Sequence, residues 1–539
     1  MIEKIDRHRQ KLYIAIMLIC IFATRAVCLM HGARLHPDET VFEYSASSLA
    51  DCLLGEADEY KEIKEYPEGA YVFQMPFYVL GHLLNKVGLD IPERALGRAG
   101  AVIYFALGAM LGAMLLFRFF NAQRVQFSIY ATIIVFSLIH IEQSRYATGD
   151  AISMFLIMLI VYLSALALER RNVGAYKWLL LAFASTGALC AVKYPLIFFG
   201  IIPLYAATMY IKGKSLGKKL AIAAAMLLAL FVVFLLFSPK VIADPMYVKR
   251  VIDIELGRYM VSGNMAEVGG KKNHLASMAI YTLFYSGFPL ALIFACLGFA
   301  ATWKRRGELG AHGSLFGIVL PITIGVFFAY NICVKTLFMR TLYPFFFLTD
   351  IYVAVAAGEL VCKHRWGKGL CTALCAFMAM RGIFLVYAMA EPAEYDRVDR
   401  LIERAVDDGW QKTTKLESVM GMWLPFDEEG CIELGLESLY DGGYDGRFSA
   451  PETARLEEGE LLITATLDYS RCNRYFFPIY DEIVNAGIER WEMFKNVNKE
   501  YYVGSAYPDY YYYLFGYWIK GTTGTDYEFP SCAVYYRSN

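Results

Sequence analysis

Two acidic residues stand side by side just after the first apolar segment of the chain. The sequence there is His36-Pro37-Asp38-Glu39. Adjacent carboxylates suit general-base chemistry, in which one carboxylate takes a proton from a hydroxyl group while the other orients a neighbouring group or a metal ion. The alternative is a solvated loop in which Asp38 caps a helix that begins near Glu39.

A second polar turn, residues 142–150, connects two apolar segments. Asp150 is placed to cap the helix that follows it, a role that stabilises by about 1 kcal/mol and is sufficient reason for its presence. Arg145 lies beside Tyr146, and a guanidinium group can hold a phosphate through two parallel hydrogen bonds. We therefore predict that Arg145 binds an anion, and that Asp150 either supports this site or only caps its helix.

Three further cations, Arg98, Lys193 and Arg340, each stand at the end of an apolar segment. Taken singly, each is explained by an interface anchor whose charged head extends into water. Together with Arg145 they would form a cationic rim suited to an anionic lipid headgroup. His274 could add a phosphate contact or a metal ligand, although a lone histidine is more often structural.

These residues must be positioned by membrane helices, as the composition of the chain indicates. The chain has 539 residues, of which 57% are hydrophobic and 19% are charged, with a mean hydropathy of +0.39. A soluble protein carries about 25% charged residues. The apolar excess is gathered in runs long enough to cross a bilayer, which excludes fibrous, disordered and nucleic-acid-binding proteins.

The apolar runs and the basic connections between them predict the threading. Twelve runs cover residues 12–30, 71–87, 98–117, 125–141, 151–168, 178–192, 195–211, 220–237, 276–302, 315–330, 342–360 and 370–390. The N-terminus and five later connections are basic, and short basic segments stay in the cytoplasm. They can share that side only if one early run does not cross. Run 71–87 is the most interrupted by polar residues, so we predict that it is an interfacial helix and that eleven helices span the membrane.

This threading divides the chain into two domains. Residues 1–390 form an all-α polytopic membrane domain with a cytoplasmic N-terminus, and its first extracytoplasmic loop, residues 31–97, carries 12 acidic against 5 basic residues and contains juxtamembrane helices. Residues 391–539 hold 14 basic and 28 acidic residues, so their net charge is −14, against +13 for the rest. Short apolar stretches at 460–467, 501–517 and 533–536 predict an extracytoplasmic soluble domain of α/β or mixed type.

In the order and spacing of its motifs, the chain resembles the C-type (GT-C) membrane glycosyltransferases, in particular the branch that contains the protein O-mannosyltransferases and the bacterial lipid A aminoarabinose transferase. The likeness covers roughly residues 10–390. It rests on the Asp38-Glu39 pair, Tyr66-Pro67-Glu68-Gly69, Arg98, Ser144-Arg145-Tyr146 through Asp150, Val192-Lys193-Tyr194-Pro195, and Arg340 through Pro344.

The resemblance implies an inverting enzyme that moves a sugar from a polyprenyl-phosphate donor to a hydroxyl of a glycan, lipid or protein on the outer face of a bacterial plasma membrane. It implies that Asp38 is the general base and that Glu39 and Asp150 belong to the catalytic site, with Glu68 and Tyr146 orienting the acceptor. The implied donor-phosphate ligands are Arg98, Arg145, Lys193 and Arg340. The resemblance implies no certain cofactor, because members of the family differ in metal dependence, and Glu39 and His274 are the candidate ligands if a divalent metal takes part.

This chain departs from the family pattern at two points, which limits how many of the family's functional details can be carried over to it. The Tyr66-Pro67-Glu68-Gly69 segment replaces a longer motif with two prolines, which leaves the role of Glu68 open, and the acidic tail does not match the soluble module of the protein O-mannosyltransferases. The competing function is a polytopic transporter or flippase of lipid-linked or anionic substrates, for which many apolar helices are equally expected. The sequence shows no internal repeat of the transporter type. A third function is a non-catalytic lipid- or glycan-binding scaffold.

Overall fold

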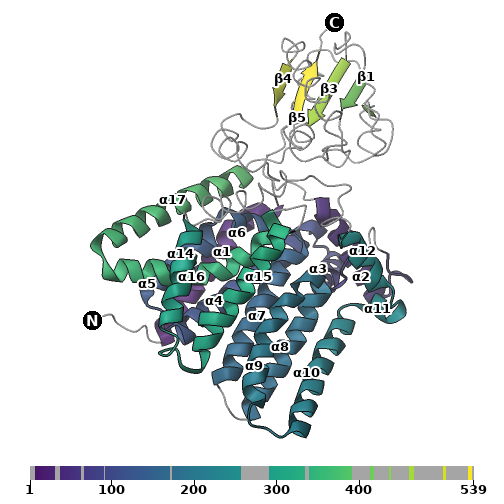
Figure 1. Ribbon diagram of the computed structural model, residues 1–539. Helices are drawn as coiled ribbons and strands as arrows, with labels where there is room; N and C mark the ends of the chain where they lie inside the picture. Colours follow the sequence, from purple (N-terminus) through teal and green to yellow (C-terminus); the bar gives the residue numbers. More distant parts are fainter. Residues whose placement is uncertain are drawn as a thin grey trace.

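The computed structural model describes residues 7–30, 37–61, 66–89, 91–169, 173–256, 290–333 and 339–390, together with five strands between residues 413 and 536. Up to residue 390 the described elements are helices (Figure 1). They are α1 (Arg7–Met30), α2 (Pro37–Leu54), α3 (Gly69–Lys86), α4 (Glu93–Phe119), α5 (Arg124–Phe136), α6 (Leu138–Gln143), α7 (Gly149–Glu169), α8 (Val173–Val192), η1 (Tyr194–Gly200), α9 (Ile201–Ile211), α10 (Leu216–Leu236), α11 (Pro239–Ala243), α12 (Tyr247–Leu256), α14 (Ala291–Lys304), η4 (Gly310–His312), η5 (Leu315–Val319), α15 (Leu320–Cys333), η6 (Met339–Leu342), α16 (Tyr343–Lys363) and α17 (Arg365–Ala390).

Seven of the described helices are long and apolar enough to cross a membrane. They cover Arg94–Phe119, Gly149–Glu169, Gly174–Val192, Tyr194–Ile211, Leu216–Leu236, Leu315–Cys333 and Tyr343–Lys363. This confirms an all-helical polytopic membrane domain. The remaining four predicted spans fall on α1, on α5 with α6, on the region of α14, and on α17, and their crossing stays a prediction. The predicted interfacial helix α3 is also outside the seven.

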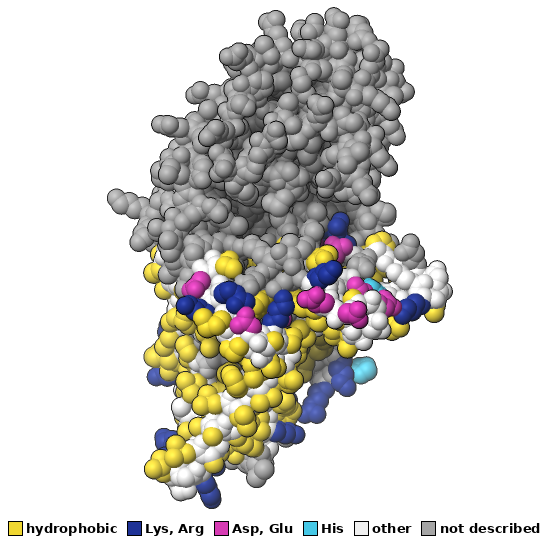
Figure 2. All heavy atoms as spheres, turned by 90° about the vertical axis from the view of Figure 1, so that its right-hand side faces the viewer, with side chains coloured by type: hydrophobic (Ala, Val, Ile, Leu, Met, Phe, Trp, Pro, Cys, Tyr) yellow, Lys and Arg dark blue, Asp and Glu magenta, His cyan; other side chains and the backbone are white. Residues whose placement is uncertain are grey.

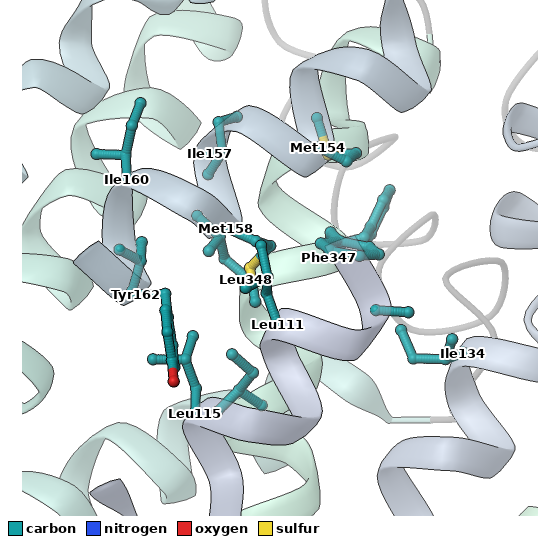
Figure 3. Packing of buried hydrophobic residues seen from close by; sticks show 14 of the residues in the cluster. Leu111, Leu115, Ile134, Met154, Ile157, Met158, Ile160, Tyr162, Phe347 and Leu348 are labelled. Carbon is teal, nitrogen blue, oxygen red and sulfur yellow. The ribbon is translucent and has the colours of Figure 1, made fainter. Parts of the chain in front are cut away.

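The core of the bundle forms around α7. In the most apolar part of α7, 89% of the residues are buried, whereas the corresponding figure for α10 is 6%. Figure 3 shows Leu111 of α4, Met158 of α7 and Leu348 of α16 packed together in this core. The exposed side of α10 carries Leu228 and Phe231, which are more than half exposed. Such a side suits contact with lipid, and Figure 2 shows a broad hydrophobic surface bounded at one end by acidic and basic side chains.

The predicted apolar run 125–141 is not one helix but two. It breaks at Ser137, which has an extended backbone (φ −62°, ψ 131°) and separates α5 from α6. The last carbonyls of a helix have no partner within the helix. Here the fully buried guanidinium of Arg25 donates to the carbonyls of Ile134 and Val135, at 2.9 and 2.6 Å. Arg25 of α1 therefore caps α5 at the point where the chain turns toward residues 142–150.

The C-terminal strands form one mixed sheet. They are β1 (Thr413–Glu417), β2 (Leu436–Ser438), β3 (Glu460–Ala465), β4 (Tyr502–Ser505) and β5 (Cys532–Tyr536), in the order β2-β1-β3-β5-β4 (Figure 1). The β1 strand pairs in parallel with β2 and β3, and β5 pairs antiparallel with β3 and β4. The strands β3 and β4 fall within the apolar stretches predicted at 460–467 and 501–517, and β5 begins one residue before the stretch predicted at 533–536. The residues between the strands lie outside the described part, so a separate domain at 391–539 stays a prediction.

Candidate active site at one end of the helical bundle

Glu39 of α2 is fully buried and joins three elements that are distant in the sequence. Its two carboxylate oxygens accept hydrogen bonds from Nε and Nη2 of Arg98 in α4, at 2.9 and 2.8 Å. The Oε1 atom also accepts the backbone N–H of Ala147, at 2.9 Å. Paired, charge-assisted bonds of this kind fix both position and orientation. The Glu39–Arg98 pair therefore holds α2 against α4 and against the turn that contains Arg145 and Tyr146.

Asp150 and Lys193 form an ion pair between the first turn of α7 and the end of α8. The ammonium group of Lys193 contacts Oδ1 of Asp150, and the hydroxyl of Thr148 donates to Oδ2 at 3.1 Å. Asp150 lies one residue inside α7, where a negative charge is favoured by the helix dipole. Its side chain is 5% exposed, whereas that of Lys193 is 35% exposed. The ammonium group therefore lies on the open side of the pair, where a second anion can reach it.

Glu68 occupies a buried position at the start of α3. Its Oε2 accepts the backbone N–H of Lys240 at the start of α11, at 2.8 Å. The next residue, Gly69, packs so closely on α8 that an added Cβ would lie 2.5 Å from the carbonyl carbon of Ala191 and 2.7 Å from the nitrogen of Val192. The glycine of the Tyr66-Pro67-Glu68-Gly69 motif thus permits α3 to approach the residues that precede Lys193.

Arg145 and Tyr146 contact each other in the turn between α6 and α7. The Nη2 of Arg145 donates to the hydroxyl of Tyr146 at 2.6 Å, and the guanidinium lies 4.6 Å from the centre of the tyrosine ring. Both residues are about 4% exposed. A cation over an aromatic face at this distance is stabilised further when it is shielded from water. The turn therefore holds its arginine in a defined, buried position.

A cavity of about 370 Å³ opens beside these contacts. Asp150 and Lys193 are the charged residues that line it, and its walls are otherwise mostly apolar and aromatic. The walls include Phe42, Met154, Leu196, Phe198, Phe327 and Tyr330. Thr341 and Pro344 also line it, so the chain at Arg340 runs directly alongside. An apolar cavity lined by a few charged groups suits an amphipathic ligand.

Three of the predicted site residues cannot be placed by their side chains. The side chains of Asp38 and Arg340 and the whole of His274 lie outside the described residues. The backbone of Asp38 belongs to α2, where it precedes Phe42 of the cavity wall by four residues. Residues four apart share a helix face. Glu39, a candidate metal ligand, has both oxygens engaged by Arg98 and Ala147.

Sequence analysis missed three buried charged or titratable groups close to this site. Besides Arg25, these are His140 of α6 and Asp350 of α16, whose Nε2 and Oδ2 atoms lie 2.6 Å apart. Arg25 is also within 3.2 Å of the hydroxyl of Ser144, next to Arg145. Each lies within an apolar run, and an ionisable residue inside such a run is itself a functional signal. That signal would have identified all three.

Comparison with known proteins shows the same architecture. No protein-family model and no curated protein sequence matches the chain. Among solved structures, ArnT from Cupriavidus metallidurans bound to undecaprenyl phosphate matches with a TM-score of 0.51 and 13% identity, over 84% of this chain and 92% of that one. The apo state of the same enzyme gives a TM-score of 0.49 at 13% identity, over 77% and 83% of the two chains.

The protein O-mannosyltransferase Pmt1-Pmt2 complex of S. cerevisiae, bound to its sugar donor, gives a TM-score of 0.33 at 23% identity, over 43% of this chain and 33% of that one. The first match covers almost the whole of ArnT. It confirms, at the level of the fold, the resemblance to GT-C glycosyltransferases that the sequence predicted.

Proposed function

We propose that this protein is an integral-membrane, inverting glycosyltransferase that moves a sugar from a polyprenyl phosphate to a hydroxyl acceptor on the outer face of the membrane. The observation that carries this proposal is the cavity whose walls are apolar except for the Asp150–Lys193 ion pair and a few polar groups. A lipid-linked phosphate has the matching chemistry, with an apolar chain and one anionic group. The ArnT structure that shares this fold contains undecaprenyl phosphate, which supports the same ligand class here.

In the proposed reaction Asp38 is the general base. Its carboxylate takes the proton of the acceptor hydroxyl, and the hydroxyl oxygen attacks the anomeric carbon from the side opposite the phosphate. The bond between that carbon and the phosphate oxygen breaks, and its electron pair leaves with the polyprenyl phosphate. A single displacement of this kind inverts the configuration of the anomeric carbon. This role is supported by the backbone position of Asp38 in α2, four residues before Phe42 of the cavity wall.

The cations of the site stabilise the charge that gathers on the leaving phosphate. We assign this role to Lys193, Arg145 and Arg340, because fixed cations in a poorly hydrated site stabilise developing charge without reorganising. Asp150 holds Lys193 in place. Arg98 acts through Glu39, since their bidentate pair fixes the start of α2 and therefore the position of Asp38. Glu68 and Tyr146 are assigned to the acceptor side.

The experiment is the release of free polyprenyl phosphate by purified protein supplied with a membrane extract as acceptor source. The donors are polyprenyl phosphates that bear a hexose, an N-acetylhexosamine or a pentose. We expect release by the wild type and by Glu43→Gln, an acid one turn further along α2 that pairs with Arg94, and no release by Asp38→Asn. Movement of intact donor across sealed proteoliposomes without release of polyprenyl phosphate would replace this proposal with the flippase function.

A further inference from the structure

A histidine and two carboxylates converge where α2 and α3 end. Asp51 lies in the last turn of α2, and Glu56 follows in a turn where Gly55 adopts a left-handed backbone (φ +72°). His82 lies near the end of α3, and its Nδ1 is 3.2 Å from Oδ1 of Asp51 and 3.3 Å from Oε2 of Glu56. The ligand atoms of these three residues lie within 4.8 Å of one another. None of them belongs to the cavity described above.

The spacing of these atoms is long for charge-assisted hydrogen bonds and is compatible with metal coordination. A charge-assisted hydrogen bond between nitrogen and carboxylate has a length of about 2.7–2.9 Å. Tetrahedral Zn²⁺ binds histidine nitrogen and carboxylate oxygen at about 2.0–2.2 Å, which places neighbouring ligand atoms about 3.3–3.6 Å apart. The two distances from His82, 3.2 and 3.3 Å, lie at the short end of that range. One Nδ1–H could point well at only one of the two oxygens, whereas a metal ion uses both.

A neighbouring lysine contacts one of the proposed ligands from outside the cluster, and we call this the outer contact. Lys86 donates to the other carboxylate oxygen of Glu56, Oε1, at 2.6 Å, and so leaves Oε2 facing His82. The side chains of His82, Asp51 and Glu56 are 14%, 33% and 38% exposed. This leaves an open side through which an ion can enter and water can complete its coordination.

We propose that Asp51, Glu56 and His82 form a binding site for one divalent transition-metal ion, best matched by Zn²⁺, which links the end of α2 to the end of α3. Two carboxylates offset the charge of the ion, and the histidine favours zinc over magnesium or calcium. The backbone of the turn is already set, because the N–H of Glu56 donates to the carbonyl of Asp51 at 2.8 Å. The site is therefore built largely before the ion binds.

The position of this link gives it a structural effect on the two helices. Asp38 and Glu39 lie at the other end of α2, and Glu68 directly precedes α3. Figure 1 places α2 and α3 together at one end of the bundle. An ion that joins their far ends restrains how α2 lies against α3. Metal binding should therefore raise the unfolding temperature even when no donor or acceptor is present.

The test uses full-length, tag-free protein stripped of metal, with Zn²⁺ titrated by calorimetry, metal content measured after desalting, and Co²⁺ as an optical probe of nitrogen coordination. We expect one Zn²⁺ per chain and a higher unfolding temperature. His82→Gln keeps an N–H donor toward the carboxylates but removes the imidazole ligand, and should weaken zinc binding about tenfold or more. Asp51→Asn should do the same, which separates loss of a ligand from a folding defect at position 82.

Two control variants complete the experiment. Lys86→Gln removes the outer contact but no ligand atom and should still bind zinc. His364→Gln removes a histidine that follows α16 and is not part of the cluster, and should bind zinc as the wild type does. The proposal is overturned if the wild type binds no zinc, or if His82→Gln binds it with the wild-type affinity and the same rise in unfolding temperature.

Discussion

Glu39 and Arg98 form a buried, bidentate ion pair 59 residues apart in the sequence, with contacts of 2.8 and 2.9 Å. The side chains are 0% and 4% exposed, so the two charges are shielded from water and depend on each other. The same carboxylate binds the N–H of Ala147. The pair therefore fixes the start of α2, where Asp38 lies, relative to the turn that carries Arg145.

Glu39→Gln should lower the stability of the protein strongly. Removal of one partner of a buried ion pair leaves the other charge uncompensated, at a cost of about 3–5 kcal/mol. Thermal unfolding in detergent measures this effect. Glu43→Gln, which breaks the more exposed pair with Arg94, is the matched control and should cost less than about 1 kcal/mol. Equal unfolding temperatures for the two variants would show that Glu39 does not have the structural role assigned to it.

Gly69→Ala should displace α3 from α8. The added Cβ would meet backbone atoms of Ala191 and Val192 at 2.5 to 2.7 Å, and backbone cannot move aside as a flexible side chain can. We expect a loss of transferase activity together with a lower unfolding temperature. Gly88→Ala, whose position has open space but a left-handed φ of +83°, controls for backbone strain alone. Full activity in Gly69→Ala would show that this close approach is not needed.

The sequence predicts the position of the apolar helices and part of the site, because these depend on local patterns, whereas α11 and α12 correspond to no predicted run. Every apolar run corresponds to one or more described helices, and the ends of those helices bring Glu68, Asp150 and Lys193 to one region. The break at Ser137 could not be predicted, because it depends on Arg25, which is more than 100 residues away. Contacts of this kind follow from packing and have no signal in local periodicity.

The same reasoning applies to the three proposed metal ligands at the ends of α2 and α3. Asp51, Glu56 and His82 have no recognisable metal-binding spacing, because the helices that carry them fold back on each other. The predicted metal ligand Glu39 was chosen for its position in an acidic pair, and the sequence could not show that Arg98 engages it. The sequence thus shows which residues near the site are charged. Which residue each of them contacts becomes known only from the folded structure.

The His140–Asp350 pair should be strongly coupled. It joins α6 to α16, its side chains are 0% and 2% exposed, and the rings of Phe105, Tyr343 and Phe347 surround the imidazole at 5.5 to 5.6 Å. His140→Phe or Asp350→Asn alone should destabilise by about 3–5 kcal/mol, since each leaves a buried polar partner. A double-mutant cycle of unfolding free energies should give a coupling of at least about 1 kcal/mol. Additive effects would exclude a direct interaction.

Lys193→Gln should weaken donor binding more than it affects stability. Lys193 is the more exposed member of its pair with Asp150, and both residues line the cavity. The variant loses a hydrogen bond between charged groups, so the KM for the polyprenyl-phosphate donor should rise about tenfold or more. Lys193→Arg keeps the charge and should retain part of the affinity. Lys86→Gln removes a lysine that does not line the cavity and should leave KM unchanged, so an equal rise in both glutamine variants would exclude a specific phosphate contact.

The orientation of the bundle predicts which loops are accessible from outside the cell. Arg305 follows α14 beside Lys304 and Arg306, and clusters of basic residues of this kind remain in the cytoplasm. Lys86 ends α3 at the site end of the bundle, and its side chain is 58% exposed. In a cysteine-free background, Lys86→Cys should react with an impermeant maleimide on intact cells, whereas Arg305→Cys should react only after permeabilisation. The reverse pattern would place the cavity on the cytoplasmic side, where a donor and acceptor of the outer leaflet could not reach it.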